Sequence, residues 1–444
     1  SNLTQLIIFI LLKMEISQLH QLFLQCGEVT TDSRCLPNGS IFFALRGERF
    51  DGNAFAAKAL EGGCAYAVVD DENLPADPRF IRVENALTTL QQLAAFHRKH
   101  LGIPILQITG TNGKTTTKEL TAAVLAENHH IVYTQGNLNN HIGVPLTLLR
   151  LTSEHDMGVI ETGANHPGEI DFLSRIVDAN EGLITNVGRA HLEGFGSFEG
   201  VVQTKTELYR YLQSKPNTSI FLHADNEILA RHVGTLPTVT YGSVGNGFDV
   251  EGEVIDCTPF LRFRFRVGGE EWHEVQTQLI GSYNLPNALA AIAVGSRHGI
   301  SAKQAADAIA RYAPSNRRSE LVKTARNRLI VDAYNANPTS MKAALDNFAL
   351  IASPRKLAIL GEMRELGEVS AEEHRRVVEQ ASGIPDTELW LVGENFRPFV
   401  PKNARWFADV EAVKQTLQTD CPSDALILVK GSNGTRLFQL PEFL

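Results

Sequence analysis

Apolar residues in this chain fall into short runs, separated by turns rich in glycine, proline and polar residues. The runs that fit buried strands cover residues 40–45, 65–69, 105–108, 157–160, 182–185, 329–332, 356–360, 389–392 and 425–429. Helical spacing of apolar positions predicts helices over 86–100 and 284–298, and another that opens after residue 113. Buried strands that alternate with helices predict an α/β fold built on parallel sheets.

Residues 248–280 have a different pattern. Between Phe260 and Val267 apolar residues alternate strictly with arginines, and two glycines follow at 268 and 269. Strict alternation is typical of a strand with one buried and one solvated face, and the glycines allow a tight turn. We therefore expect a β-hairpin here. Its arginines are also compatible with nucleic-acid contact, but a solvated strand face is the favoured interpretation.

The length of 444 residues corresponds to about three folding units. The pattern predicts a small α/β domain over residues 14–84, a central parallel-sheet domain over 85–314 and a doubly wound α/β domain over 315–444. A linker is expected at residues 313–316. We interpret residues 1–13 as a non-native or extended N-terminus before a natural start at Met14, in preference to a membrane anchor.

Composition narrows the function classes. With 43% hydrophobic and 20% charged residues, the chain has the composition of an ordinary globular protein. The net charge of -9 argues against a nucleic-acid partner, because phosphate binding needs a basic face. Five scattered cysteines without a CxxC pair indicate neither a disulfide framework nor a zinc site, and they fit a reducing cytoplasm. The apolar stretch at 6–12 is too short to span a bilayer, so we expect no stable membrane anchor.

The strongest chemical signal is a glycine-rich loop between the strand at 105–108 and the next helix, formed by Gly110, Thr111, Asn112, Gly113, Lys114, Thr115 and Thr116. Glycines let backbone amides turn toward a phosphate, and a helix N-terminus favours negative charge. Lys114 can neutralise nucleotide phosphate oxygens, and the Thr115 hydroxyl can bind Mg²⁺. The spacing departs from the usual phosphate-loop pattern, because Ile108 stands where its first glycine would be.

Two further residues follow predicted strands. Glu161 comes directly after the strand at 157–160, at the edge where open parallel sheets bind ligands, and its carboxylate is suited to Mg²⁺. His191 lies beyond the strand at 182–185 and can offer an imidazole nitrogen to a second metal; a packing or capping histidine is the alternative. Lys205 falls in a helical pattern, where lysine is usually a surface residue.

Several of these segments together resemble a known family. The run GTNGKTTT, the ETGAN stretch from Glu161, the segment TNVGRAHLEGFGS from Thr185 and the pair Asn284 and Asn287 are similar to the central ATPase domain of the Mur ligases, which build the cell-wall peptide. The resemblance covers essentially all of residues 14–444. Within the family, the segments at 136–145 (GNLNNHIGVP), 332–338 (DAYNANP) and 361–367 (GEMRELG) resemble the member that joins D-alanyl-D-alanine to UDP-N-acetylmuramoyl-tripeptide.

The resemblance implies a small UDP-binding domain, a central P-loop-type ATPase domain and a C-terminal Rossmann-like ligase domain. It also implies ATP and two Mg²⁺ ions as cofactors. Lys114 and Thr115 would bind the ATP phosphates and the first Mg²⁺, with Glu161 as a further ligand of that ion. His191 would help to hold the second Mg²⁺, and Lys205 matches the family lysine that is carbamylated by CO₂ into a metal-supporting anion.

The remaining implied roles concern nucleotide and substrate. Adenosine contacts are implied for Asn284, Asn287, Asp332 and Asn335. Substrate contacts are implied for Ser33, Arg34, Asn137, Asn139, Asn140 and Lys430. Arg318 matches the interdomain arginine of the family, but Arg317 replaces the glycine expected before it. Asn433 likewise stands where the family often has arginine after Lys-Gly-Ser.

The implied reaction activates the tripeptide carboxylate as an acyl phosphate, which the amine of D-alanyl-D-alanine then attacks while the third domain closes over the central one. We expect a monomer in the cytoplasm. One alternative is a sibling ligase that adds a single amino acid, although the DNPR-type segment expected of it is absent from this sequence. A second alternative is a P-loop nucleotide-gated binding module, which would leave the asparagine-rich loop at 137–140 unexplained.

Overall fold

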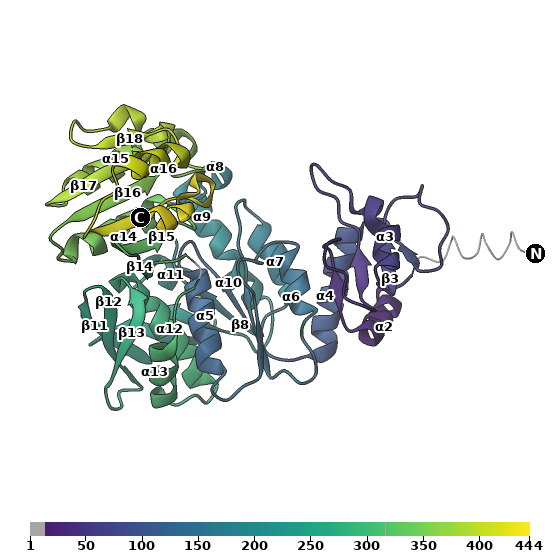
Figure 1. Ribbon diagram of the computed structural model, residues 1–444. Coiled ribbons are helices and arrows are strands. Elements are labelled where there is room, and N and C mark those ends of the chain that lie inside the picture. The colour runs from purple at the N-terminus through teal and green to yellow at the C-terminus, as the bar shows by residue number, and fades with distance from the viewer. Residues whose placement is uncertain (1–13, 316) are drawn as a thin grey trace, which may run out of the picture. The chain divides into compact units, whose positions relative to one another are not determined.

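The computed structural model describes residues 14–315 and 317–444. The predicted N-terminal addition at 1–13 and the last position of the predicted linker, residue 316, lie outside the described residues. Within them, helices alternate with strands that form sheets of four, nine and six strands (Figure 1). The predicted α/β fold is confirmed, whereas the domain boundaries stay predictions.

Contacts within the chain divide it into two compact units. Of the described residues, the first unit contains 14–107, together with His130–Thr162 and Phe172–Asn180. The second contains Ile108–His129, Gly163–Asp171 and the chain from Glu181 onwards. The glycine-rich loop therefore belongs to the second unit, and Glu161 belongs to the first.

The first unit contains a four-stranded parallel sheet in the order β1-β2-β3-β4. Its strands are β1 (Val29–Thr30), β2 (Ile41–Phe43), β3 (Tyr66–Val69) and β4 (Phe80–Arg82), and the neighbouring helices are α2 (Ile16–Cys26), η1 (Gly52–Phe55), α3 (Ala56–Glu61) and α4 (Ala86–Leu101). Phe42 and Ala67 pack with α3 in one apolar cluster. Ile41 and Phe43 alternate to the opposite face, and α4 contacts β2.

The nine-stranded sheet has the order β13-β12-β11-β10-β9-β8-β5-β7-β6. The strands are β5 (Ile105–Thr109), β6 (Ile131–Tyr133), β7 (Met157–Glu161), β8 (Glu181–Ile184), β9 (Ser219–His223), β10 (Thr238–Ser243), β11 (Val250–Cys257), β12 (Phe260–Val267) and β13 (His273–Ile280). The pairs β6–β7, β8–β9, β9–β10 and β10–β11 are parallel, which confirms the predicted parallel sheet.

The predicted hairpin is β12 followed by β13, which pair antiparallel and extend the nine-stranded sheet. The apolar positions Leu261, Phe263 and Phe265 are fully buried. The arginines between them form cross-strand ion pairs: Arg262 with Glu274 at 2.7 Å, Arg264 with Glu253 at 2.5 Å and Arg266 with Glu251 at 2.8 Å. The charged face is thus a ladder of opposite charges, as a solvated strand face requires.

Helices cover this sheet and position its loops. They are α5 (Lys114–Leu125), α6 (Gly143–Leu148), α7 (Glu169–Val177), α8 (Leu192–Phe195), α9 (Phe198–Lys205), α10 (Glu207–Gln213), α11 (Glu227–His232), η2 (Ser282–Asn284), α12 (Leu285–Arg297) and α13 (Ala302–Arg311). The alanine-rich face of α12 is buried and packs against α5, the helix that opens at the glycine-rich loop. Small side chains allow the two helices to approach closely, so the start of α12 lies beside that loop.

The six-stranded sheet has the order β14-β15-β19-β16-β17-β18, in which β14 alone runs antiparallel to its neighbour. Its strands are β14 (Glu320–Lys323), β15 (Arg328–Asp332), β16 (Lys356–Gly361), β17 (Thr387–Val392), β18 (Arg405–Phe407) and β19 (Leu426–Lys430), and its helices are α14 (Pro338–Leu350), α15 (Ser370–Ser382) and α16 (Val410–Thr419) (Figure 1). One face packs with α16 in an apolar cluster. The alternating residues face the other way, and α15 contacts β17, so the predicted doubly wound architecture is confirmed.

Within the part of the chain that the structure describes, no helix combines the length and the apolar character needed to cross a membrane.

Candidate active site

The glycine-rich loop makes the turn from β5 into α5 that the sequence predicts. Gly110 has φ of 140°, and a Cβ atom there would lie 1.9 Å from the hydroxyl of Thr185. Gly113 has φ of 79° and is the residue that caps the start of α5. Other residues rarely adopt these conformations, so the two glycines are required for the loop to form.

The segment after β8 holds this loop from one side. The amide of Asn112 donates to the side-chain oxygen of Asn186 at 2.9 Å, and the Thr185 hydroxyl donates to the Asn112 carbonyl at 2.6 Å. The amide of Gly188 donates to the Thr111 hydroxyl at 2.9 Å. These bonds fix the direction of the loop backbone, as a phosphate-binding turn requires.

Lys114 and Thr115 begin the helix that follows. The ammonium of Lys114 donates to the carbonyls of Gly110 at 2.8 Å and Thr111 at 3.2 Å, so the side chain lies back over the loop. Thr115 is buried. This is the arrangement in which a lysine can meet phosphate oxygens at a helix N-terminus.

Asn284 and Asn287 lie beside the loop, buried at 5% and 7% exposure. Asn287 accepts from the Thr117 hydroxyl of α5 at 3.0 Å and donates to the side chain of Asn284 at 3.0 Å, which itself donates to the carbonyl of Ile280 at 2.9 Å. The two amides therefore brace α5. The adenine contact implied by the resemblance stays a prediction.

His191 and Lys205 lie near Lys114. Burial and the positive charges of Lys114 and Lys205 lower the pKa of His191, against the opposing effect of Glu365. Burial, together with the charge of Lys114, lowers the pKa of Lys205 well below its usual value, although Glu169 and Glu207 oppose the shift. Lys205 is 2% exposed, so the prediction from its helical pattern alone, a surface lysine, is wrong.

The surroundings of Lys205 explain its burial. Its ammonium lies 5.5 Å from the ring centre of Phe195. Glu207 holds the start of α7 in place, because the amide of Gly168 donates to both of its carboxylate oxygens at 2.9 and 3.2 Å. Burial raises the pKa of Glu207. Lys205 is thus a buried amine beside an aromatic ring, and the carboxylates of Glu169 and Glu207 are near enough to oppose the lowering of its pKa.

Several predicted site residues lie at the six-stranded sheet, which belongs to the second unit together with the glycine-rich loop. The Lys430 ammonium pairs with Asp332 at 2.8 Å and donates to the carbonyl of Asn335 at 3.2 Å. The guanidinium of Arg318 lies 3.9 Å from the ring centre of Tyr334. Arg317, which replaces the glycine expected by the resemblance, has φ of 55°, in the region that favours glycine.

The start of α14, which follows β15 in the chain, meets the glycine-rich loop and the loop that carries His191. The side-chain NH₂ of Asn337 donates to the side-chain oxygen of Asn112 at 2.8 Å, and the side-chain NH₂ of Asn112 donates to the side-chain oxygen of Asn337 at 3.4 Å. The Arg189 amide donates to the Thr339 hydroxyl at 3.0 Å. No role was predicted for Asn337 from the sequence, although it lies in the DAYNANP segment on which part of the resemblance rests.

In the first unit, Glu161 ends β7 and is 1% exposed. Its backbone amide donates to the Thr134 hydroxyl at 2.9 Å, and its carboxylate accepts from the side chain of Asn139 at 2.8 Å. Asn140 accepts from the amides of residues 142 and 143, at the start of α6. The structure thus joins Glu161 to the asparagine-rich loop, in which Asn137 is exposed.

Ser33 and Arg34 lie in the turn after β1. The Arg34 guanidinium pairs with Asp32 through two bonds of 2.9 and 3.0 Å, and its side chain is 88% exposed. Hydrogen bonds from Arg34 lower the pKa of Asp32 to about 2. The predicted UDP contact stays a prediction.

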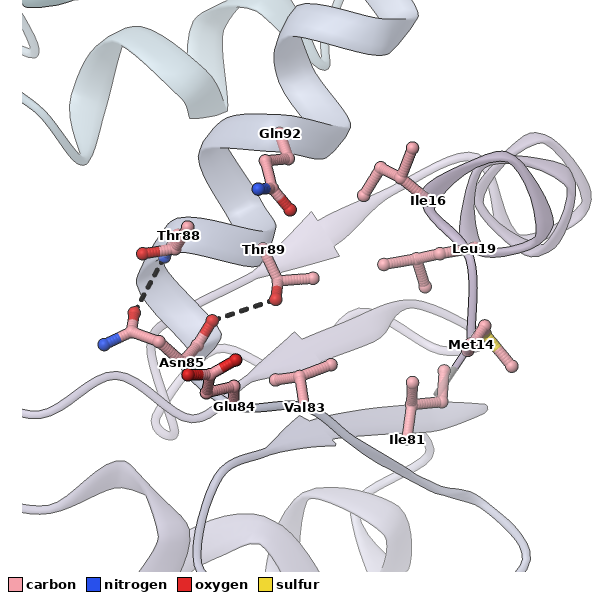
Figure 2. A pocket seen from close by; sticks show the side chains of 10 residues that line it. All are labelled: Met14, Ile16, Leu19, Ile81, Val83, Glu84, Asn85, Thr88, Thr89 and Gln92. Atoms are coloured by element: carbon pink, nitrogen blue, oxygen red, sulfur yellow. Dashed lines mark hydrogen bonds between the residues drawn. The ribbon is translucent and has the colours of Figure 1, made fainter. Parts of the chain in front are cut away.

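A pocket of about 280 Å³ lies between α2, β4 and the start of α4 (Figure 2). Met14 and Leu19 line one side and Thr88 and Gln92 the other, while Asn85 accepts from the amide of Thr88 at 2.8 Å. None of the predicted site residues lines this pocket.

Comparisons with known proteins agree with the geometry. The Mur ligase middle domain matches residues 108–295, the glutamate ligase domain of Mur ligases matches 317–433, and the catalytic domain of the Mur ligase family matches 26–98. A UDP-N-acetylmuramoyl-tripeptide--D-alanyl-D-alanine ligase of Bacillus subtilis is 33% identical and covers 93% of this chain and 92% of its own length.

Two solved structures are similar along nearly the whole chain. One is MurF from Acinetobacter baumannii, with a TM-score of 0.83, 31% identity and coverage of 93% of this chain and 92% of that one. The other is MurF ligase from Thermotoga maritima in complex with ADP, with a TM-score of 0.84, 25% identity and coverage of 95% and 97%. Sequence, fold and the braced glycine-rich loop lead to one conclusion: this chain belongs to the Mur ligase family.

Proposed function

We propose that this chain uses ATP to join D-alanyl-D-alanine to UDP-N-acetylmuramoyl-tripeptide, with release of ADP and phosphate, as a monomer in the cytoplasm. The relatives that carry this activity in their names support the substrates. The structural observation that carries the proposal is the braced glycine-rich loop, with the Lys114 side chain lying back over it. Nearby, His191 and Lys205 both contact the ring of Phe195, and the charge of Lys114 affects the pKa of each.

The chemistry must bring two anions together. The terminal carboxylate of the tripeptide attacks the γ-phosphorus of ATP, and an acyl phosphate forms as ADP leaves. Lys114 and the N-terminus of α5 offset the negative charge of the phosphates. The amine of D-alanyl-D-alanine then attacks the acyl carbon through a tetrahedral oxyanion, and phosphate leaves. Water must be kept out, since it would hydrolyse the acyl phosphate.

Site residues divide by role. For catalysis we propose Lys114, Glu161, His191, Lys205 and Arg318. For ATP we propose the loop from Gly110 to Thr116 with Asn284, Asn287, Asp332 and Asn335. For the UDP-linked substrate we propose Ser33, Arg34, Asn137, Asn139, Asn140 and Lys430. The bond between Asn112 and Asn337 supports closure of the C-terminal sheet's loops over the nucleotide.

The hydroxyl of Thr115 and the carboxylate of Glu161 are oxygen ligands of the kind that Mg²⁺ prefers. Among the described residues, no three His, Cys, Asp or Glu side chains gather as a metal cage. A nucleotide-bound Mg²⁺ needs only one or two protein carboxylates, because phosphates and water fill its other positions. Thr115 would bind the first ion from the glycine-rich loop, and His191 with carbamylated Lys205 would support the second. Glu161 is kept as a further ligand of the first ion on the family resemblance alone. When bound, Mg²⁺ neutralises the reacting phosphates.

Carbamylation of Lys205 is chemically consistent with its surroundings. Burial lowers the pKa of Lys205, which favours the neutral amine over the ammonium. The lone pair of the amine attacks CO₂; the C–N bond forms as a C=O π bond opens, and the nitrogen loses a proton, leaving an anionic carbamate. The cation at Lys114 is placed to stabilise that anion, as its effect on Lys205 indicates.

A phosphate-release assay tests the function. Full-length protein, ATP and UDP-N-acetylmuramoyl-tripeptide are mixed with either D-alanyl-D-alanine or single amino acids. We expect dipeptide-dependent phosphate release and a ligated product by mass spectrometry. Preference for a single amino acid would favour the sibling ligase, and hydrolysis that ignores the muramyl substrate would favour the nucleotide-gated binding module.

A further inference from the structure

The segment GEMRELG at 361–367 has no role in the function proposed so far, yet one of its side chains reaches the active-site loop. Glu365 contacts the Nδ1 atom of His191 with its carboxylate. The carbonyl of the same residue accepts from the amide of Glu193 at 3.1 Å. Glu365, in a loop of the C-terminal six-stranded sheet, thus contacts both the His191 ring and the backbone of Glu193, two residues further along.

Both residues in this contact have unusual backbone conformations. His191 has φ of 48° and Glu365 has φ of 59°, both in the left-handed region that is unfavourable for residues other than glycine. Neither position is occupied by glycine or asparagine, which would relieve the strain. Strain that persists in two side-chain-bearing residues facing each other is a mark of a functional site.

The loop that carries Glu365 is braced on its own domain. Met363 is 1% exposed, and its amide donates to the Nε2 atom of His374 at 3.0 Å. The other ring nitrogen of His374 bonds the carbonyl of Ser370 at 2.7 Å. Leu366, on the other side of Glu365, is 3% exposed. The carboxylate is therefore presented from a fixed base and not from a mobile loop.

We propose that Glu365 is a positioning residue that fixes the tautomer and orientation of His191. A carboxylate at Nδ1 keeps the proton on that nitrogen and leaves the lone pair on Nε2, the arrangement that metal-binding histidines commonly use. Because Glu365 belongs to the C-terminal sheet's loops and His191 to those of the nine-stranded sheet, His191 is oriented only when these loops meet. This inference rests on the proposed function for the identity of the cation.

Three variants separate positioning from simple docking. Glu365→Ala removes the carboxylate; Glu365→Gln keeps an oxygen that can accept from Nδ1–H. Thr339→Val is the matched control. It removes the hydrogen bond that the Arg189 amide donates to the Thr339 hydroxyl, between the start of α14 and the loop that carries His191, and it leaves the contact of His191 with Glu365 in place. The Glu365 side chain is 51% exposed, so its replacement leaves the fold intact.

The first readout is the ¹⁵N spectrum of histidine-labelled full-length protein with ADP, in which His191→Gln identifies the His191 signals. We expect the proton on Nδ1 in the unmodified protein, Glu365→Gln and Thr339→Val, and a shift toward Nε2–H in Glu365→Ala. The second readout is Mn²⁺ binding with ADP by electron paramagnetic resonance, where Glu365→Ala is expected to lose about 10- to 100-fold in affinity.

Unchanged His191 signals in Glu365→Ala would overturn the inference. Equal changes in Thr339→Val and Glu365→Ala would also overturn it, since they would reduce Glu365 to a docking contact. Neither readout needs ligation to occur, so a failure here is distinguishable from a failure of the phosphate-release assay.

Discussion

Lys205 shows how burial changes the chemistry of a single residue. Its position at the end of α9 resembles that of any helical lysine, but its ammonium is removed from water beside Phe195. A charged amine that is removed from water is costly, which is why burial lowers the pKa of Lys205.

Replacing Lys205 tests its proposed conversion into an anionic carbamate. We expect Lys205→Ala to lower the ligation rate by about 10- to 100-fold, as for loss of a residue that supports a metal, and short carboxylic acids such as acetate to restore part of it. Lys303→Ala, an exposed lysine of the same unit, is the control. An unchanged rate in Lys205→Ala would remove this residue from the site.

A buried histidine pair gives the first unit a pH-dependent stability. His97 donates through Nε2 to the carbonyl of Leu151 at 2.7 Å, so its Nδ1 accepts from His20 at 3.0 Å. Burial, then the neighbouring His97 and His100, lower the pKa of His20 to about 4 from 6.5. Between these values the unfolded chain binds a proton that the folded chain does not, so stability is lost as the pH falls from 6.5 toward 4.

We expect the unfolding free energy of the first unit to drop by about 1–2 kcal/mol between pH 7.5 and pH 5 through this group. In His20→Phe this pH dependence should shrink, although stability at pH 7.5 also falls because Nδ1 of His97 loses its partner. Urea titrations at both pH values measure the difference, and His141→Gln, at an exposed position, should keep the full dependence. An equal slope in His20→Phe would contradict the assignment.

At the scale of elements, the N-terminus of α14 combines two tasks in one side chain. Asn337 accepts from the amide of Ser340 at 2.9 Å, which caps the helix, and it also donates to Asn112 of the glycine-rich loop. An N-cap is worth about 1 kcal/mol, and serine caps as well as asparagine.

Two substitutions separate these tasks. Asn337→Ser keeps the cap but is too short to reach Asn112, whereas Asn337→Ala loses both. We expect Asn337→Ala to be about 1 kcal/mol less stable than Asn337→Ser in denaturant titrations, with similarly weakened ADP binding in both. If only the alanine variant bound ADP less well, the contact with Asn112 would have no part in nucleotide binding.

Elements with a strong local pattern could be predicted from the sequence. Strands β5, β7, β15 and β16 are apolar runs buried on both faces, and the hairpin at β12 has strict alternation. Strands β1, β6 and β18 could not be predicted in the same way, because they contain only two or three residues and have no period to detect. Their pairing depends on the neighbouring strand and not on their own composition.

Within the candidate site, the glycine-rich loop could be predicted because its conformation depends on its own glycines. The contacts of His191 with Glu365 and of Asn112 with Asn337 join residues more than 170 positions apart. The spacing of residues along the chain does not predict such long-range contacts, because they depend on how the loops of two different sheets come together. The resemblance named the GEMRELG segment, but only the structure gives Glu365 a partner.

At the scale of the whole molecule, nucleotide binding should stabilise the unit that contains the glycine-rich loop. A ligand at 100 times its Kd adds about 2.7 kcal/mol to the unfolding free energy of the state that binds it. We expect this increase with ADP, measured by thermal and chemical unfolding, and its loss in Lys114→Ala. Lys342→Ala, an exposed lysine paired with Asp346, should respond to ADP as the unmodified protein does. An undiminished response in Lys114→Ala would contradict the assigned role.

The buried amides of Asn284 and Asn287, together with Ile280 and Thr117, support the glycine-rich loop from behind. Because these bonds join groups of the protein itself, binding a nucleotide does not have to order this part of the loop. Differences in affinity among nucleotides should therefore be expressed mainly in their dissociation rates.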